Sequence, residues 1–209
     1  MKTLTRFILS SFGGKVVKRE EIERLCGRFK ADADKTINFM ISYGYFLRIL
    51  RGLNYVKTLE EFKFKKSIKV YEILSLAMER LKVKWYFGLY TSLRLNGLTH
   101  EYFDTIFILN DRIFRPKEIK VGEEKVKFVK LKSKLFGFGT VNENHINFSD
   151  VEKTLLDFIY VSRYRSVPEE RTVSIIEDYS KNVKIEKIMA YLKFYPKTVE
   201  RMVKNARLI

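Results

Sequence analysis

Residues 31–57 read ADADKTINFMISYGYFLRILRGLNYVK, and this stretch decides the fold of the first third of the chain. Asp32 is expected to cap a helix, because its carboxylate can accept the free N–H groups of the first turn. Three apolar residues then recur at the spacing of one helix face, namely Ile37, Met40 and Ile41. Gly44 favours the end of this helix, since glycine adopts the left-handed conformation at little cost.

A basic hairpin is expected directly after this helix. Residues 46–50 and 54–57 have the composition of two short strands, and Arg51-Gly52-Leu53 forms the turn between them. A helix followed at once by a positively charged hairpin is typical of the recognition helix and wing of a winged helix-turn-helix. Such a unit docks its helix in the major groove of duplex DNA and places its wing on the neighbouring backbone.

The residues before this stretch complete the same unit. Residues 3–11 predict a first short helix with Leu4, Phe7 and Ile8 on its inner side. Residues 15–18 predict an extended segment, and residues 19–29 predict a second helix whose apolar side includes Leu25 and Phe29. The expected order is therefore helix, short strand, helix, turn, helix and hairpin, complete by about residue 58.

The charge of the chain favours a polyanionic partner. Lys and Arg number 41 against 25 Asp and Glu in 209 residues, which gives a net charge of +16. The excess is densest at the start, with 15 basic and 7 acidic residues up to Lys66 and 26 against 18 in the longer remainder. Several of these cations lie in or just after the wing: Arg48, Arg51, Lys57, Lys63, Lys65 and Lys66.

Composition also limits the other classes of protein. Apolar residues make up 46 % of the chain, enough for packed cores. Cys26 is the one cysteine, so neither a disulfide framework nor a cysteine-based metal site is expected. The apolar run near the N-terminus is too short for a signal peptide, and no stretch approaches the ~20 apolar residues of a membrane span. We therefore expect a cytoplasmic protein without membrane contact.

A polar connector over residues 58–67 predicts two domains, a winged helix-turn-helix over 1–60 and a mixed α+β domain over 61–209. The second domain is expected to open with helices over 68–81 and 86–96. Short β-rich runs follow at 105–109, 126–131, 136–141 and 145–148. Ser149 to Glu152 has the pattern of a capping box that starts another helix. Helical patterns then occupy 169–180, 184–193 and 196–206. The predicted fold class is α+β, with a small sheet and C-terminal helices.

Three stretches, in this order, resemble the AbiEi-type antitoxin family of bacterial and archaeal type IV toxin–antitoxin systems. Residues 48–57 (RILRGLNYVK) resemble its arginine-glycine-aromatic hairpin, and residues 85–100 (WYFGLYTSLRLNGLTH) resemble its segment of a small-residue helix followed by Gly-Leu-Thr. Residues 148–160 resemble its Glu-Arg-Thr-Leu-Leu-Asp helix, carried here by Glu152, Thr154, Leu155, Leu156 and Asp157. Lys153 departs from the pattern, because the family usually has arginine there.

The resemblance implies more than the residues themselves predict. It implies an N-terminal DNA-binding domain that represses its own operon, and a C-terminal domain that neutralises a partner toxin of the nucleotidyltransferase type. Because lysine lacks the planar fork of arginine, the departure at Lys153 puts any role that needs two-pronged binding in doubt.

The helix and wing define the residues expected to bind double-stranded DNA. Polar residues on the outer side of the helix are expected to face base edges, and these are Asp34, Lys35, Asn38 and Ser42. Cations on the wing and at the start of the second helix are expected to contact phosphates, and these are Arg19, Arg48, Arg51 and Lys57.

Little in the sequence predicts catalysis. No Walker loop, dinucleotide fingerprint or nucleophile elbow is present, and His100 and His145 have no partner at ligand spacing. We therefore expect no cofactor, no metal ligand and no enzymatic activity. The main alternative is a metal-dependent nuclease, since Asp104 or Asp111 with Glu118 and Lys120 has the loose form of an Asp…Glu-x-Lys site.

A further alternative is a module that binds an acidic protein or RNA. Its evidence is the run of cations on the predicted C-terminal helices: Lys181, Lys184, Lys187, Lys193, Lys197, Arg201, Lys204 and Arg207. Such a run is more often the solvated side of amphipathic helices.

Overall fold

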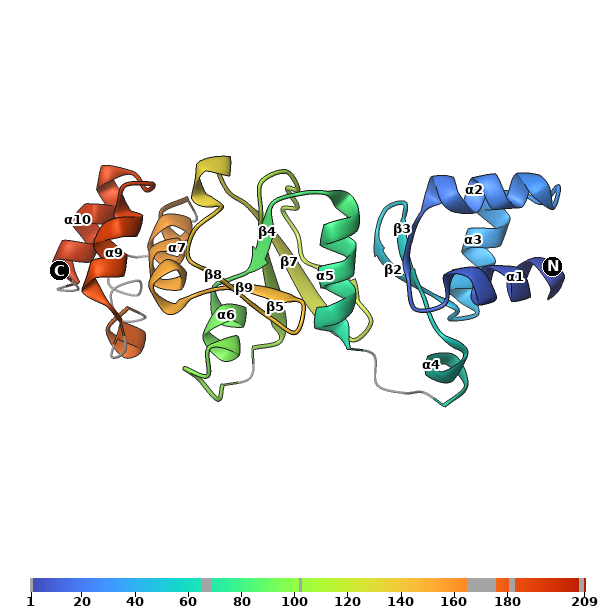
Figure 1. Cartoon of the computed structure of the whole chain (residues 1–209), viewed down its shortest axis with the longest axis horizontal. Coiled ribbons are helices and arrows are strands. Elements are labelled where there is room, and N and C mark those ends of the chain that lie inside the picture. The colour runs from blue at the N-terminus through green and yellow to red at the C-terminus, as the bar shows by residue number, and fades with distance from the viewer. Residues whose placement is uncertain (1, 65–68, 102, 165–175, 181–182, 207–208) are drawn as a thin grey trace. The chain divides into compact units, whose positions relative to one another are not determined.

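The structure is a computed structural model of the 209-residue chain (Figure 1). It describes residues 2–64, 69–101, 103–164, 176–180, 183–206 and 209. The fold class is α+β, as the sequence predicts. Two compact units make up the chain: the first comprises Met1–Lys82 with Lys120–Glu124, and the second Val83–Ile119 with Lys125–Ile209.

The first unit contains a winged helix-turn-helix. Its helices and strands follow one another in the predicted order: α1 (Lys2–Phe12), β1 (Val16–Lys18), α2 (Arg19–Arg28), α3 (Ala33–Ser42), β2 (Phe46–Leu50) and β3 (Leu53–Val56). The strands form an antiparallel sheet in the order β1-β3-β2. Because β3 lies in the centre, the β2–β3 hairpin projects as the wing.

Helix α3 is held by a cap and by one buried side. The Asp32 carboxylate accepts a hydrogen bond from the backbone N–H of Lys35 at 2.8 Å, as the sequence predicts for an N-cap. Met40 and Thr36 are buried beneath the helix. Met40 belongs to a hydrophobic core to which the helices and strands from α1 to β3 all contribute. Its other buried members are Leu4, Ile8, Val17, Ile22, Leu25, Cys26, Phe46 and Val56.

Two residues expected in this core lie outside it. Phe7 and Phe29 are 43 % and 38 % exposed, and their ring centroids lie 5.4 Å apart. Their helical spacing was therefore misleading, because each sits at the margin of the apolar side rather than at its centre. The two rings instead cover one another at the surface.

The predicted polar connector contains an additional helix. Thr58 caps α4 (Leu59–Lys63) in a capping box with Glu61, and the Tyr55 hydroxyl donates to the same Glu61 carboxylate at 2.9 Å. Helix α5 (Val70–Leu81) then contacts β1 and β3 within the first unit. The two compact units therefore divide after Lys82, and the expected boundary between residues 60 and 61 falls inside the first unit.

A mixed sheet has the order β6-β7-β5-β4-β9-β8, and all of its strands except β6 lie wholly or almost wholly in the second unit. Its strands are β4 (Trp85–Phe87), β5 (Thr105–Asn110), β6 (Ile119–Val121), β7 (Glu124–Lys130), β8 (Thr140–Glu143) and β9 (Ile146–Ser149). The β5–β7 and β4–β9 pairs are parallel, whereas the β4–β5 and β8–β9 pairs are antiparallel.

Two parts of this sheet differ from the sequence-based expectation. The helix predicted over 86–96 is instead β4 followed by the shorter α6 (Tyr90–Leu95), because residues 85–87 pair with strands on both sides. The strand predicted over 136–141 begins only at Thr140, after the 3-10 helix η1 (Ser133–Leu135). Gly137 and Gly139 between them have positive φ, which interrupts an extended strand.

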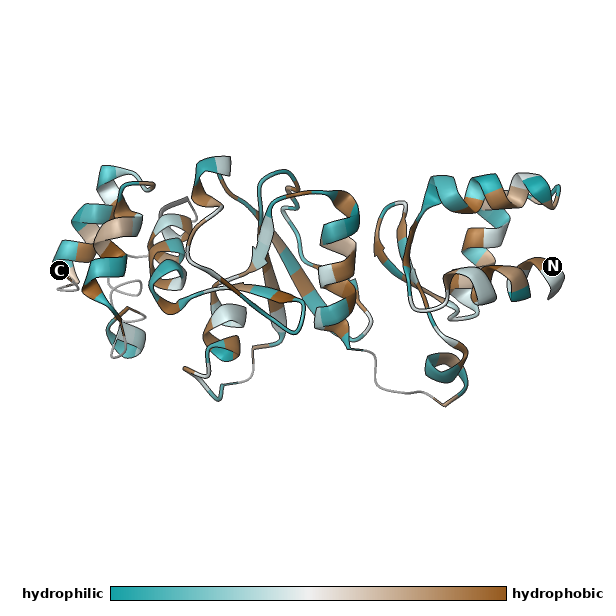
Figure 2. Cartoon of the chain, in the orientation of Figure 1, coloured by the Kyte–Doolittle hydropathy of each residue, from teal (hydrophilic) through white to brown (hydrophobic). Residues whose placement is uncertain are grey.

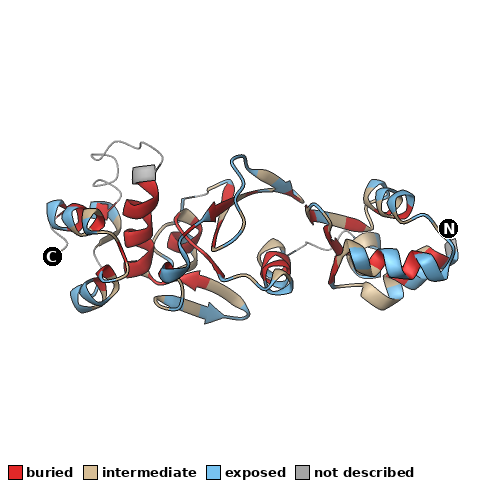
Figure 3. Ribbon diagram, turned by 90° about the horizontal axis from the view of Figure 1, so that it is seen from above, coloured by how far each residue is buried: buried red, intermediate tan, exposed pale blue. Residues whose placement is uncertain are grey.

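Helix α7 (Val151–Tyr164) is buried along most of its described length (Figure 3) and contacts α6, β9, α9 and α10. Its N-cap is Asp150 rather than the predicted Ser149, since the Asp150 carboxylate accepts from the N–H of Lys153 at 2.9 Å. The amphipathic helices α9 (Ile185–Leu192) and α10 (Lys197–Asn205) pack on α7 (Figure 2). The helix expected over 169–180 lies largely outside the described residues.

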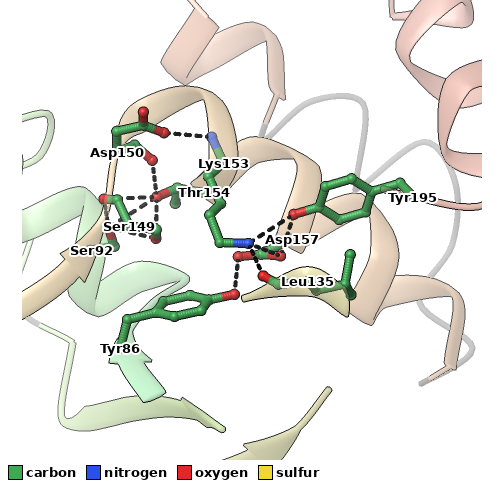
Figure 4. A network of polar contacts seen from close by, with 9 residues as sticks. All are labelled: Tyr86, Ser92, Leu135, Ser149, Asp150, Lys153, Thr154, Asp157 and Tyr195. Carbon is green, nitrogen blue, oxygen red and sulfur yellow. Dashed lines mark hydrogen bonds and ion pairs between the residues drawn. The ribbon is translucent and has the colours of Figure 1, made fainter. Parts of the chain in front are cut away.

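A buried polar network joins α7 to the sheet and to the C-terminal helices (Figure 4). The Asp157 carboxylate accepts from the Tyr86 hydroxyl at 2.8 Å and from the Tyr195 hydroxyl at 2.7 Å. The Lys153 ammonium lies 3.6 Å from that carboxylate and donates to the Leu135 carbonyl at 2.8 Å. Burial lowers the pKa of Lys153 and raises the pKa of Asp157.

This network predicts a large and specific loss of stability. Asp157→Ala should lower the free energy of unfolding by about 3–5 kcal/mol, because it leaves the buried Lys153 ammonium without a counter-charge. Lys153→Met combined with Asp157→Asn should recover at least half of that loss, since the charge is gone and the tyrosines keep an acceptor. Urea unfolding followed by circular dichroism measures the difference.

The matched control for this prediction is Asp104→Ala. The Asp104 carboxylate is 61 % exposed and pairs with Lys125 at the surface, so its removal should change stability little. A double variant as unstable as Asp157→Ala would show that the ion pair is not the source of the loss.

Candidate nucleic-acid interface

A hollow of about 370 Å³ lies between α3 and the wing. It brings together five of the eight residues that the sequence predicts for DNA contact: Arg19, Asp34, Asn38, Arg48 and Arg51. The other lining residues are Ile37, Ile41, Gly52 and Asn54. The predicted interface is thus a concave surface with three arginines on or beside it.

Arg19, at the start of α2, is held by two carboxylates. Its guanidinium lies 2.7 Å from the Asp34 carboxylate of α3 and 2.6 Å from the Glu23 carboxylate of α2. The hydrogen bond to Asp34, followed by the one to Glu23, raises the pKa of Arg19, and the same Arg19 guanidinium lowers the pKa of Asp34. Asp34 therefore already has a cationic partner within the protein.

The wing is tied to the second helix at its turn. The backbone N–H of Arg19 donates to the carbonyl of Gly52 at 2.9 Å. Gly52 has a φ of +77°, which glycine adopts without the strain that a side chain would bring. This contact fixes the tip of the hairpin, so that the exposed Arg51 is presented beside the hollow.

Three predicted residues do not line the hollow. Lys35 is exposed on α3, and the Ser42 hydroxyl donates to the carbonyl of Phe39 at 3.0 Å in the last turn. Lys57 follows β3 at the base of the wing and is half-buried. These residues flank the concave surface rather than form it.

Asn54 is a residue of the hollow that the sequence analysis did not select. It lies on β3 opposite Arg48, so both side chains are on the same side of the sheet as α3. Asn54 is only 3 % exposed, and within the described residues its side-chain amide has no hydrogen-bond partner. Asparagine is disfavoured in strands, and its presence between Leu53 and Tyr55 was the available signal.

The apolar residues of α3 divide between two roles. Met40 is fully buried, as expected for a residue that supports the helix. Ile37 and Ile41, which share the apolar face with Met40, are half-buried and also line the hollow. Apolar side chains at such positions can contact thymine methyl groups.

The residues that carry the family resemblance in α7 are structural in character. Thr154 and Asp157 are fully buried, as is Lys153, which departs from the pattern, and Glu152 is 4 % exposed. Thr154 bonds with Ser92 and Ser149, and the Glu152 carboxylate accepts from the N–H of Lys184 at 2.9 Å. This part of the pattern therefore maintains the packing of the second unit.

The aspartates of the nuclease alternative both have partners within the protein. Asp104 and Asp111 flank opposite ends of β5, so at most one of them could act with Glu118 and Lys120. Asp104 pairs with Lys125, and the Asp111 carboxylate accepts from the N–H of Lys84. Within the described ranges, no group of three His, Cys, Asp or Glu side chains is placed to hold a metal ion.

The C-terminal cations mostly occupy the outer sides of α9 and α10. The exposed ones are Lys184, Lys193, Lys197, Arg201 and Lys204, whereas Lys181 and Arg207 lie outside the described residues. Lys187 is paired internally, at 3.0 Å from the Asp150 carboxylate and 3.5 Å from the Glu152 carboxylate.

The fold and the site define a winged helix-turn-helix protein with a second, mixed α+β unit. The chain is similar in fold to the RV2827C protein from Mycobacterium tuberculosis, with a TM-score of 0.61 and 13 % identity over 98 % of this chain and 76 % of that one. No protein-family model and no curated protein matches the sequence. Among the described helices, none is long and apolar enough to cross a membrane.

The unpartnered amide of Asn54 predicts an unusual response to mutation. Asn54→Leu should leave the free energy of unfolding within about 0.5 kcal/mol of the parent value, because the Asn54 amide faces the hollow and the change breaks no hydrogen bond within the described residues. Urea unfolding measures the change, and Asn110→Leu is the control. The Asn110 amide accepts from two backbone N–H groups, so its loss should cost about 1–3 kcal/mol. Equal losses in the two variants would contradict the prediction.

Proposed function

We propose that this protein is a sequence-specific DNA-binding repressor that docks α3 in the major groove of duplex DNA. The observation that carries the proposal is the gathering of Asn38, Arg48 and Arg51 around one concave surface between α3 and the wing. All three side chains are exposed, and the helix behind them is fixed by its cap and by Met40. A helix held on one side and free on the other suits insertion into the groove.

Each residue then has a distinct role. Asn38 reads a base edge, since an asparagine amide can form two hydrogen bonds with adenine. Arg48 and Arg51 contact phosphates and set the register of the unit on the duplex, as does Lys57 at the base of the wing. Lys35 and Ser42 contact bases or phosphates at the margin of the docked helix.

Arg19 and Asp34 form a pair in this proposal. Because the Asp34 carboxylate lies 2.7 Å from the Arg19 guanidinium, Asp34 is already paired and does not accept from a cytosine, and it competes with phosphate for Arg19. Asn54 lies deeper in the same hollow, and its free amide supplies a further donor or acceptor to the bound DNA.

The biological role that we propose is that of an antitoxin. The three stretches that resemble the AbiEi-type family support a cytoplasmic protein that represses its own operon and counteracts a toxin of the nucleotidyltransferase type. An adjacent reading frame of that type, whose product co-purifies with this chain, is the observation that tests this part. A product that neither binds the chain nor is neutralised on co-expression would contradict it.

The DNA-binding proposal predicts that two residues of the hollow fail in different ways. Asn38→Ala should change the preferred sequence and cost about 1–3 kcal/mol on the parent's best site, because it removes a base contact. Arg51→Ala should weaken all sequences alike and reduce the salt slope by ~1, because it removes one phosphate contact. Selection from a random duplex library, followed by fluorescence anisotropy at several salt concentrations, measures both effects.

The control for these variants is Arg28→Ala. Arg28 is an exposed arginine at the end of α2 opposite to Arg19, so it has the same charge and lies away from the hollow. Parent-like binding by both the Asn38 and Arg51 variants would place the docking surface elsewhere.

The pairing of Arg19 with Asp34 predicts a gain of affinity. Asp34→Ala removes a negative charge from a surface that faces phosphates, so duplex binding should strengthen about two- to fivefold at low salt. Asp34→Asn should behave similarly, and Glu20→Ala, which removes an exposed carboxylate of α2 outside the hollow, is the control. A loss of affinity confined to the selected sequence would show instead that Asp34 reads a base.

A further inference from the structure

A larger hollow lies wholly on the second unit. It has a volume of about 810 Å³ and lies beside the end of β7, the residues after β7 and the middle of α7. Its buried lining includes Val129, Leu131, Tyr160 and Val161. This volume falls within the range of pockets that hold small ligands.

The charged residues around this hollow favour an anion. Four cations line it, Arg115, Lys127, Lys130 and Lys132, against the single carboxylate of Asp111. The Lys127 ammonium donates to the Pro116 carbonyl, and the Asp111 carboxylate accepts from a backbone N–H. Within the described residues, Arg115, Lys130 and Lys132 form no ion pair. Three cations are therefore available to a ligand.

An aromatic ring stands beside these cations. Phe114 lines the hollow and is 70 % exposed, with Arg115 next to it and Arg112 two residues before it in the sequence. A phenylalanine ring left largely in water forgoes the favourable burial of its apolar surface, so a ligand that covers the ring is favoured. Exposed aromatic rings among cations are the means by which proteins bind unstacked bases and their phosphates.

We propose that this hollow binds a nucleotide unit. The base lies on the Phe114 ring above the apolar floor, and the phosphate contacts Lys130 and Lys132. A free nucleotide and a nucleotide within a single strand offer the same chemistry, whereas a duplex does not, because its bases are stacked and paired. The proposal concerns the second unit alone and holds whether or not the first unit binds duplex DNA.

The test uses the full-length chain and two kinds of probe. Fluorescein-labelled oligo-dT and oligo-rU of eight nucleotides are titrated by fluorescence anisotropy, and ATP and UTP by calorimetry. Phe114→Ala should weaken binding about tenfold or more, as the loss of one base-stacking contact does. Lys130→Ala with Lys132→Ala should also weaken it about tenfold and reduce the salt slope by roughly 1.4, at ~0.7 for each phosphate contact of a single strand.

Matched controls separate the hollow from general charge and exposed aromatic surface. Lys134→Ala with Lys184→Ala removes two exposed lysines of the same unit outside the hollow, and Phe64→Ala removes a ring that is 78 % exposed elsewhere. Both controls should bind like the parent. Arg48→Ala with Arg51→Ala should weaken duplex binding and leave single-strand binding intact, so failure of this proposal is distinguishable from failure of the DNA-binding proposal.

The dependence of each probe on Phe114 identifies the ligand. If free nucleotides and oligonucleotides both depend on Phe114, the ligand can be a free nucleotide, and if only oligonucleotides do, it is a single strand. The proposal is overturned if the hollow variants bind all probes like the parent, or if the control pair weakens binding equally. It is also overturned if no probe binds, whether or not the hollow variants lose an acidic protein partner.

Discussion

The seating of α3 is the constraint on which the proposed interface depends. Met40 is fully buried under the helix, and the Asp32 cap fixes its first turn. Because one side of the helix is held by the core, the side that carries Asn38 has a fixed direction. The contact between the Arg19 N–H and the Gly52 carbonyl fixes the wing in the same way. A helix and a hairpin with fixed directions can define a binding surface, whereas a mobile pair would lose its binding energy to ordering.

The second unit contains a buried ion pair. It buries a lysine and an aspartate at its centre, and such pairs contribute less to stability than apolar packing of the same volume. The Lys153–Asp157 pair instead connects three segments that are distant in the sequence, through Tyr86, Leu135 and Tyr195. This arrangement specifies how α7 meets the sheet and the C-terminal helices. The residues that carry the family resemblance there are therefore best explained by packing, and the chemistry available to ligands lies in other parts of the unit.

Sequence patterns predicted the local structure of the first unit well for a physical reason. Caps, helical spacing and the Arg-Gly turn act between residues close together in the chain, so their consequences can be derived from neighbours alone. The same reasoning failed at residues 85–87, which form β4 because strands β5 and β9 lie on both sides. It also missed Asn54, because the position of its side chain in the hollow is visible only when α3 and Arg48 are placed around it.

By itself, the sequence determined the order of helices and strands in the winged helix-turn-helix, the Asp32 cap and the cationic character of the wing. Only the tertiary structure decided which of those charged residues meet. Arg19 and Asp34 are fifteen positions apart, and their ion pair depends on the angle at which α2 and α3 pack. The hollow beside Phe114 likewise combines a turn after β5, the end of β7 and α7. Contacts between distant segments depend on how cores pack, and no local pattern in the sequence specifies that packing.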